Sequence, residues 1–238
     1  MKKIIYLLIF VLNSYCFQAQ EIKNSAVITY NVTCSTPFIK KDTIIKKGET
    51  TVSKETINQA NMILLTAKDV KATLKFNSKE SLYQVDWNLN DEIGNSNFTR
   101  VFAGGNNKYY YNIDNHEFLI QSSLLGKSHI ISHKPLMWKI LDEKKQIGKY
   151  HCTKAVAKRT ETSKKISFYA WFCPDIPVPF GPLEFRNLPG LVVEGKFLHV
   201  TFNLEKIDWN ESEIDIKKPI DGEQISFKEY QKLINNSW

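Results

Sequence analysis

Residues that could carry out chemistry gather around one proline-rich stretch in the last third of the chain. His151 and Cys152 are neighbours, a pairing that could give a thiol nucleophile activated by a base. They lie in a run that alternates like a β-strand, however, and adjacent residues of a strand point to opposite faces. Asp175 and Glu184 are the acidic residues nearest the proline-rich stretch, and two such carboxylates could act as acid and base. Loop carboxylates are more often simply solvated, so we assign no catalytic residue and favour a protein that is not an enzyme.

The histidines do not define a metal site. His129 and His133 are four residues apart, which would align them on a helix. On the strand that the local pattern predicts they share a face roughly 13 Å apart, too far for one ion. No cysteine or carboxylate pair stands at ligand spacing, and no phosphate loop, dinucleotide fingerprint or Gly-x-Ser-x-Gly motif is present. We therefore predict neither a metal nor a cofactor.

Cysteine positions point to a disulfide. Cys152 and Cys173 are equidistant from residues 162 and 163, so a hairpin with a two-residue tip there would place them opposite one another. In a non-hydrogen-bonded antiparallel pair the Cα atoms are about 4.5 Å apart, within disulfide range. We expect a Cys152–Cys173 bridge in an oxidising compartment, with Cys34 left over. A bridge from Cys34 to either of them is the alternative.

The first 19 residues have the form of a secretory signal. Two lysines precede a nine-residue apolar run, residues 4–12, which is too short to span a bilayer. We expect cleavage after Ala19, which leaves residues 20–238 as a single domain; lipidation at Cys16 is the alternative. No later apolar run is long enough for a membrane-spanning helix, and the net charge of +7 is spread along the chain rather than clustered with aromatic residues. These features predict an exported protein of the periplasm or cell envelope that binds no nucleic acid.

Most of the chain has the hydrophobic alternation of short β-strands. Residues 25–34 alternate apolar and polar, and from Asp69 onward runs rich in Tyr, Phe, Val and Ile are divided by polar turns. No intervening helix is long enough for a parallel crossover. The runs with strand character are 70–77, 81–89, 98–105, 107–113, 117–124, 128–133, 137–145, 146–158, 166–172 and 191–209, the last as a hairpin or a strand bent at Gly195. The sequence predicts a mainly β fold, an antiparallel curved sheet or half-barrel.

Two segments are typical of helices instead. Residues 53–67 could be capped by Ser53 and would cover the sheet. The tail from Ile225 has Ser226 at the cap position and Glu229 three residues later, which is a capping box. We expect one covering helix and one C-terminal helix.

The proline-rich stretch, residues 171–194, holds five of the eight prolines and is called the strap below. The run 188–191, Leu-Pro-Gly-Leu, has the proline and glycine of a type II turn, and the earlier prolines favour an extended polyproline conformation. In one interpretation the strap covers one end of the sheet with its apolar side chains. In the other it is the rigid rim of an apolar pocket or a docking edge, because a rigid loop loses little entropy on binding. The residues that would then line the ligand site are Trp171, Phe180, Phe185, Leu188, Pro189, Gly190 and Leu191.

The strap also carries a family resemblance. Its motif is Asn187 to Val192, NLPGLV, and the matching residues around it are GPLEFRNLPGLVVE (181–194), IGKYHCTKA (147–155), AWFCPDIPVPFGP (170–182), Trp138 and Ile140. In this region the chain resembles the GLPGLI family of exported Bacteroidetes proteins. It departs from the family's name at the first and last motif positions, and Asn187 keeps the access to positive φ that glycine would have. The resemblance implies no activity, since the family is one of unknown function.

These features together predict a non-enzymatic binding or accessory module of the cell envelope. Its partner would be an apolar small molecule or lipid, or an outer-membrane or periplasmic protein. We expect an apolar cavity under the strap, lined by Trp171, Phe185 and Leu191. The alternatives are a hydrolase-like enzyme of unrecognised type near residues 171–194, and an envelope protein that binds a metal through its histidines.

Overall fold

The computed structural model describes residues 25–34, 67–87, 97–124, 126–159, 166–210 and 212–235. The predicted signal with its cleavage site and Cys16, the predicted helix 53–67 apart from its last residue, and the expected hairpin tip at 162–163 lie outside these residues.

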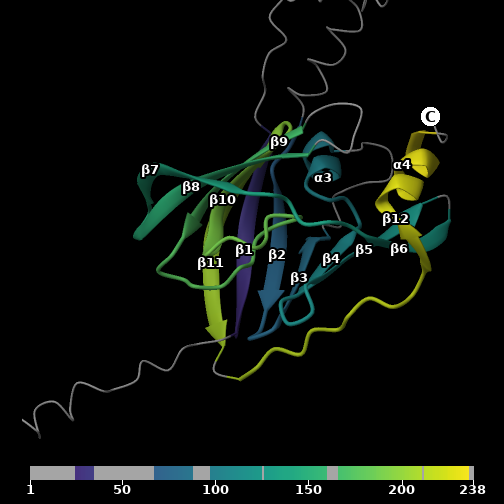
Figure 1. Cartoon of the computed structure of the whole chain (residues 1–238), viewed down its shortest axis with the longest axis horizontal. Helices are drawn as coiled ribbons and strands as arrows, with labels where there is room; N and C mark the ends of the chain where they lie inside the picture. Colours follow the sequence, from purple (N-terminus) through teal and green to yellow (C-terminus); the bar gives the residue numbers. More distant parts are fainter. Residues whose placement is uncertain are drawn as a thin grey trace, which may run out of the picture.

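Within the described residues, twelve strands form one sheet in the order β12-β6-β5-β4-β3-β2-β1-β11-β10-β9-β8-β7 (Figure 1). Neighbouring strands are antiparallel except β12 and β6, which are parallel. The strands are β1 (Ser25–Cys34), β2 (Val70–Phe76), β3 (Glu80–Val85), β4 (Lys108–Asn112), β5 (Glu117–Leu124), β6 (Lys127–Ser132), β7 (Lys139–Ile147), β8 (Tyr150–Arg159), β9 (Ile166–Cys173), β10 (Leu191–Phe197), β11 (Val200–Asn210) and β12 (Glu223–Ser226). The sheet is not closed into a barrel. The predicted mainly β, curved-sheet fold is confirmed.

One short connection shows how strongly the sheet curves. β6 and β7 stand ten positions apart in the sheet, which would be roughly 48 Å if the sheet were flat. Residues 133–138 join them, and a chain of that length reaches at most about 25 Å. The sheet must therefore curl until its two ends approach, and residues 133–138 run across the gap.

The alternating burial of residues along β1 identifies the inner face of the sheet. Ala26, Ile28, Tyr30 and Val32 are 0% exposed, whereas the residues between them are partly exposed. Two segments cover this face, namely residues 133–138 and the strap, which joins β9 to β10. Leu136 lies in the core, and the Trp138 Nε1–H donates to the carbonyl of Arg186 at 2.9 Å, tying the two segments together.

The outer face near β4–β6 is covered by the chain that follows β11. Residues 213–222 run along the sheet from β11 to β12 (Figure 1). On this face Ile216 packs with Tyr110, Leu119 and Ile130. This route brings the C-terminal residues beside β6, at the edge of the sheet.

One predicted strand is wrong: within residues 98–105 the chain forms α3 (Phe98–Phe102). The side chain of Asn97 accepts a hydrogen bond from the Thr99 N–H at 3.1 Å, which caps the helix. The rings of Phe98 and Phe102 meet at 4.5 Å between centroids, the i,i+4 contact of a helix. Local capping and this contact outweigh the β-propensity of the aromatic residues.

The C-terminal helix is confirmed as α4 (Phe227–Asn235). The carboxylate of Glu229 accepts from the Ser226 N–H at 2.8 Å, and the Ser226 hydroxyl accepts from the Glu229 N–H at 3.3 Å, which completes the predicted capping box. In the described part of the chain, no helix has the length and apolar character to cross a membrane.

Candidate functional site

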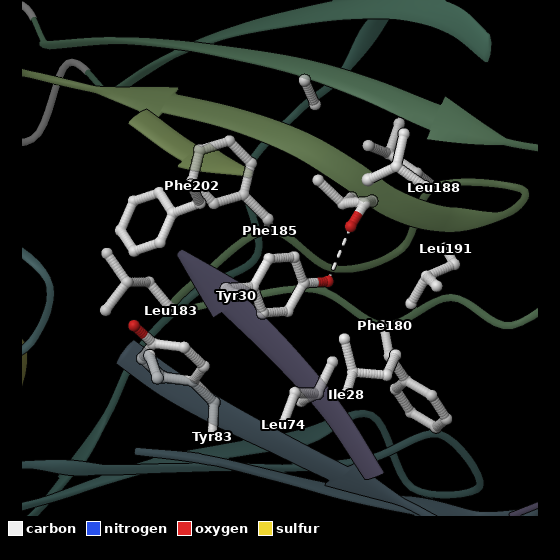
Figure 2. Packing of buried hydrophobic residues seen from close by; sticks show 14 of the residues in the cluster. Ile28, Tyr30, Leu74, Tyr83, Phe180, Leu183, Phe185, Leu188, Leu191 and Phe202 are labelled. Atoms are coloured by element: carbon white, nitrogen blue, oxygen red, sulfur yellow. Dashed lines mark hydrogen bonds between the residues drawn. The ribbon is translucent and has the colours of Figure 1, made fainter. Parts of the chain in front are cut away.

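The strap forms the core over the inner face (Figure 2). Phe180, Phe185 and Leu188 are at most 2% exposed. The Phe185 ring lies 5.8 Å from that of Trp138, and the Tyr30 hydroxyl, from the centre of the sheet, donates to the carbonyl of Val192 at 2.6 Å. These contacts match the interpretation of the strap as a cover that packs on the sheet.

Trp171 lies on the other face of β9. Ala170 and Phe172 on either side of it are buried in the core, and alternate strand residues point to opposite faces. The ammonium groups of Lys145 and Lys154 lie 4.6 and 5.7 Å from the centre of its indole ring. The structure therefore does not bring Trp171 together with Phe185 and Leu191, both of which are fully buried, around one cavity.

Close backbone packing explains the glycine of the turn at residues 188–191. Pro189 is exposed, whereas a Cβ on Gly190 would lie 2.2 Å from the Cys173 carbonyl oxygen. The Leu191 N–H donates to the carbonyl of Ile176 at 2.9 Å, instead of closing the four-residue hydrogen bond of a type II turn. The turn thus serves to hold the strap against β9.

Motif residue Asn187 adopts the positive φ that its side chain was expected to permit. Its φ is 65°. Its side-chain oxygen accepts a hydrogen bond from the Tyr111 hydroxyl, which fixes the strap to β4.

β8 and β9 pair in the predicted register. Thr153 lies opposite Phe172, so the next step along the two strands sets Cys152 beside Cys173. Both side chains are buried free thiols. Burial, with a smaller contribution from Cys173, raises the pKa of the Cys152 thiol to about 11. The register agrees with the disulfide hypothesis, and the bond itself stays a prediction.

His151 and Asp175 meet at the surface, with 3.6 Å between Nδ1 and Oδ2. Together with Cys152 they line a pocket of about 360 Å³. Their side chains are 82% and 60% exposed, and the raised pKa of Cys152 keeps its thiol protonated at neutral pH. A nucleophilic cysteine needs a lowered pKa, so this grouping lacks the features of a catalytic site.

The histidines are not grouped for metal binding. Among the described residues, no set of three His, Cys, Asp or Glu side chains is placed to hold an ion. His129 lies within β6, whereas His133 follows its end and contacts Glu184.

Glu184 is buried, in contrast to the solvated loop carboxylate expected from its sequence position. It accepts a hydrogen bond from Arg159 Nη2, and its carboxylate lies 3.3 Å from Nδ1 of His133. Arg159 and Glu184 are 6% and 7% exposed. Because these two charges are removed from water, their close contact and hydrogen bonding must offset the cost of desolvation.

Arg186 adds a second buried guanidinium next to this ion pair. It is 4% exposed, and its Nη2 donates to the carbonyl of His133 at 3.2 Å. Its Nε and Nη1 find no hydrogen-bond partner among the described residues. Burial lowers the pKa of Arg186 to about 10, against the opposing effect of Glu184, so the group is charged at neutral pH. Arg159, Glu184 and Arg186 are called the buried charge cluster below.

A cavity of about 1100 Å³ lies beside the buried charge cluster. It is formed by the ends of β5 and β6, residues 218–220, β12 and the start of α4, and is called the C-terminal pocket below. Its apolar lining is Phe118, Leu119, Ile130, Ile220, Ile225 and Phe227, and its polar lining includes His116, Glu117, Ser132, His133, Lys134, Lys218, Gln224, Lys228 and Gln231.

Each member of the buried charge cluster touches a side chain that lines this pocket. The Arg186 guanidinium lies 3.7 Å from the centre of the Phe118 ring, and Glu184 lies 3.3 Å from His133. Arg159 lies 5.2 Å from the centre of the Phe227 ring. Only the thickness of one side chain therefore separates the cluster from the pocket.

Sequence reasoning missed both arginines and the pocket. Arg186 stands in the apolar run of the strap, and a charged residue there was the one available signal. The pocket depends on the parallel pairing of β12 with β6, which no local sequence pattern predicts.

Comparison with known proteins gives a family of unknown function for part of the chain and a shared fold. A family model described as "Protein of unknown function (Porph_ging)", for a Bacteroidetes-associated family, matches residues 158–194. This match contains the whole buried charge cluster and the strap. Among curated proteins, none matches the sequence.

Two solved structures of PNGF-II, in different space groups, share the fold. They are 13% identical in sequence, with TM-scores of 0.50 and 0.52. The alignments cover 90% of this chain and 33% and 34% of those chains, so this chain spans about one third of their length. At this identity the likeness concerns the fold alone.

Proposed function

We propose that this chain is a non-enzymatic binding module of the cell envelope, of the GLPGLI type, whose ligand occupies the C-terminal pocket. The size of the pocket carries the proposal: about 1100 Å³, slightly more than the roughly 300–1,000 Å³ of typical small-molecule sites. The signal-like first 19 residues support export, and the NLPGLV motif with its flanking matches supports the family.

The lining of the pocket suits a ligand with a sizeable apolar part. Ile220 is 77% exposed, and Ile225 and Phe227 are partly exposed, so apolar surface is available to a ligand. Exposed apolar side chains gathered in a concave site favour binding, because a ligand removes them from water.

The polar lining favours binding over catalysis. The pocket carboxylate, Glu117, is engaged by Lys218 at 2.7 Å. Glu184 is buried behind the pocket wall and already paired. Neither carboxylate is therefore free to act as a base on a bound ligand.

The proposal is tested with phenylnaphthylamine, a neutral apolar dye that fluoresces when it leaves water. We expect the protein to bind it, and Ser132→Trp to weaken binding at least about tenfold, because Ser132 is exposed and lines the pocket. Ser123→Trp is the matched control, since Ser123 is an exposed residue of β5 outside the pocket lining. Absence of binding, or equal binding by the two tryptophan variants, would contradict the proposal.

A further inference from the structure

The C-terminal pocket lies next to an excess of positive charge. The buried charge cluster contains two guanidinium groups and one carboxylate, and that carboxylate is hydrogen-bonded to Arg159. Arg186 makes one hydrogen bond, to a neutral carbonyl, and leaves two of its nitrogens without partners among the described residues. A buried polar group without partners is uncommon and calls for an explanation.

The charge on the rim of the pocket is also positive on balance, with three lysines against one glutamate. Lys218 is paired with Glu117. Lys134 and Lys228 also line the pocket, are exposed, and take part in no ion pair within the described ranges. Positive charge therefore stands both behind the wall of the pocket and around its mouth.

We infer that the ligand of the C-terminal pocket is an amphiphile with an anionic group, selected by the buried guanidinium of Arg186. This inference rests on the proposed function and adds the charge of the ligand to it. The shared chemistry is an anionic oxygen next to an apolar body, as in a long-chain carboxylate or an anionic phospholipid.

Burial makes Arg186 more effective than the rim lysines. Exposed charges are screened by salt over about 3 Å at 1 M ionic strength, whereas buried charges are screened much less. The field of Arg186 reaches the pocket through the ring of Phe118, a low-dielectric path. A preference for anions that survives high salt would therefore come from the buried charge cluster rather than from the surface.

The test compares two dyes that differ by one anionic group, phenylnaphthylamine and anilinonaphthalene sulfonate. We expect the wild-type protein to bind the sulfonate roughly tenfold more tightly than the neutral dye, in low salt and in 1 M salt. Arg186→Met should abolish most of this difference by weakening binding of the sulfonate dye. Arg186→Lys should restore part of it.

The matched control is Lys75→Met, which changes the net charge by the same amount at an exposed site on β2, outside the pocket lining. It should leave the difference intact. Equal affinity for the two dyes, or a difference that Arg186→Met does not reduce, would overturn the inference and leave the proposed function standing. Failure of both dyes to bind would overturn the proposed function and the inference with it.

Competition then separates the two sources of the anion. A long-chain carboxylate or vesicles of an anionic phospholipid should displace the sulfonate dye, and whichever does so identifies the source. Displacement by the uncharged long-chain alcohol that is as strong as displacement by the carboxylate at the same concentration would overturn the inference.

Discussion

At the scale of single residues, the buried charge cluster combines two kinds of interaction. Glu184 is hydrogen-bonded to Arg159 and contacts His133, so its negative charge is compensated by close partners. Arg186 is stacked on Phe118 and has one hydrogen bond within the part of the chain that the structure describes. Removing one partner of a buried ion pair is costly because the other charge is left uncompensated, whereas replacing a poorly paired charge by an apolar group of similar volume is often neutral or stabilising.

This difference predicts opposite results for two substitutions. Glu184→Gln leaves two buried guanidinium groups without a carboxylate and should lower the free energy of unfolding by about 3–5 kcal/mol. Arg186→Met should change it by less than about 1 kcal/mol, because methionine fills the space and removes two unpartnered N–H groups. Urea denaturation at pH 7 measures both. If Arg186→Met lowered the free energy of unfolding as much as Glu184→Gln, Arg186 would have to be a strongly stabilising partner in the ion pair. That result would contradict the contacts described here.

At the scale of elements, the sequence predicted what depends on local patterning and missed what depends on distant pairing. The alternation of β1, the capping box of α4 and the register of β8 with β9 follow from residue spacing, and all three are confirmed. The hairpin of β10 and β11 is also as expected, with Phe197 opposite Val200 across two residues.

What sequence alone did not provide is the location of the site. The seven strap residues were chosen because they are apolar, but apolar residues line a core and a pocket alike, and Phe180, Phe185, Leu188 and Leu191 lie in the core. The C-terminal pocket exists because residues 213–222 carry the chain to β12, and such a route is set by packing rather than by periodicity. α3 was missed because its cap at Asn97 competes with an aromatic, strand-like composition.

The register of β8 and β9 leads to a prediction about their cysteines. With oxidised glutathione as the electron acceptor, the thiols of Cys152 and Cys173 should lose two protons and two electrons and form one disulfide. Closing a loop of this size, roughly 20 residues, should raise the free energy of unfolding by about 3 kcal/mol in the chain-entropy model.

Peptide mapping by mass spectrometry under non-reducing conditions detects the bond. Cys34→Ser is the control and should form the same bond, because Cys34 belongs to β1, which is not a neighbour of β8 or β9. A bridge that contains Cys34 would refute the pairing.

At the scale of the whole molecule, tyrosine hydroxyls are buried in the core. Tyr30 and Tyr83 are at most 1% exposed, and each donates to a backbone carbonyl, that of Val192 and that of Ala103. Burial raises the pKa of both phenols well above the ordinary value. The free energy of unfolding should therefore depend on pH in the alkaline range.

We predict that the protein loses stability as the pH rises above about 10, the pKa of tyrosine in an unfolded chain. The unfolded state releases its phenolic protons there while the folded state keeps them, so unfolding is favoured progressively as pH increases. Below that pH the phenols are protonated in both the folded and the unfolded state, so their titration should not change the stability. Tyr30→Phe should cost about 1 kcal/mol at pH 7 through the lost hydrogen bond and make the alkaline loss shallower. Thermal unfolding between pH 7 and 11 checks this, and an unchanged melting temperature across that range would contradict it.

The central position of β1 has a consequence for how the molecule folds. β1 pairs on one side with β2 and on the other with β11, so Ser25 lies opposite Asn210. Contacts between residues so far apart in sequence slow folding, because a long loop must close before they form. During synthesis the two halves of the sheet cannot join until β11 has left the ribosome, and the edge of β6 stays open until β12 follows. A chain built in this order should complete its sheet only after almost all of it has been synthesised.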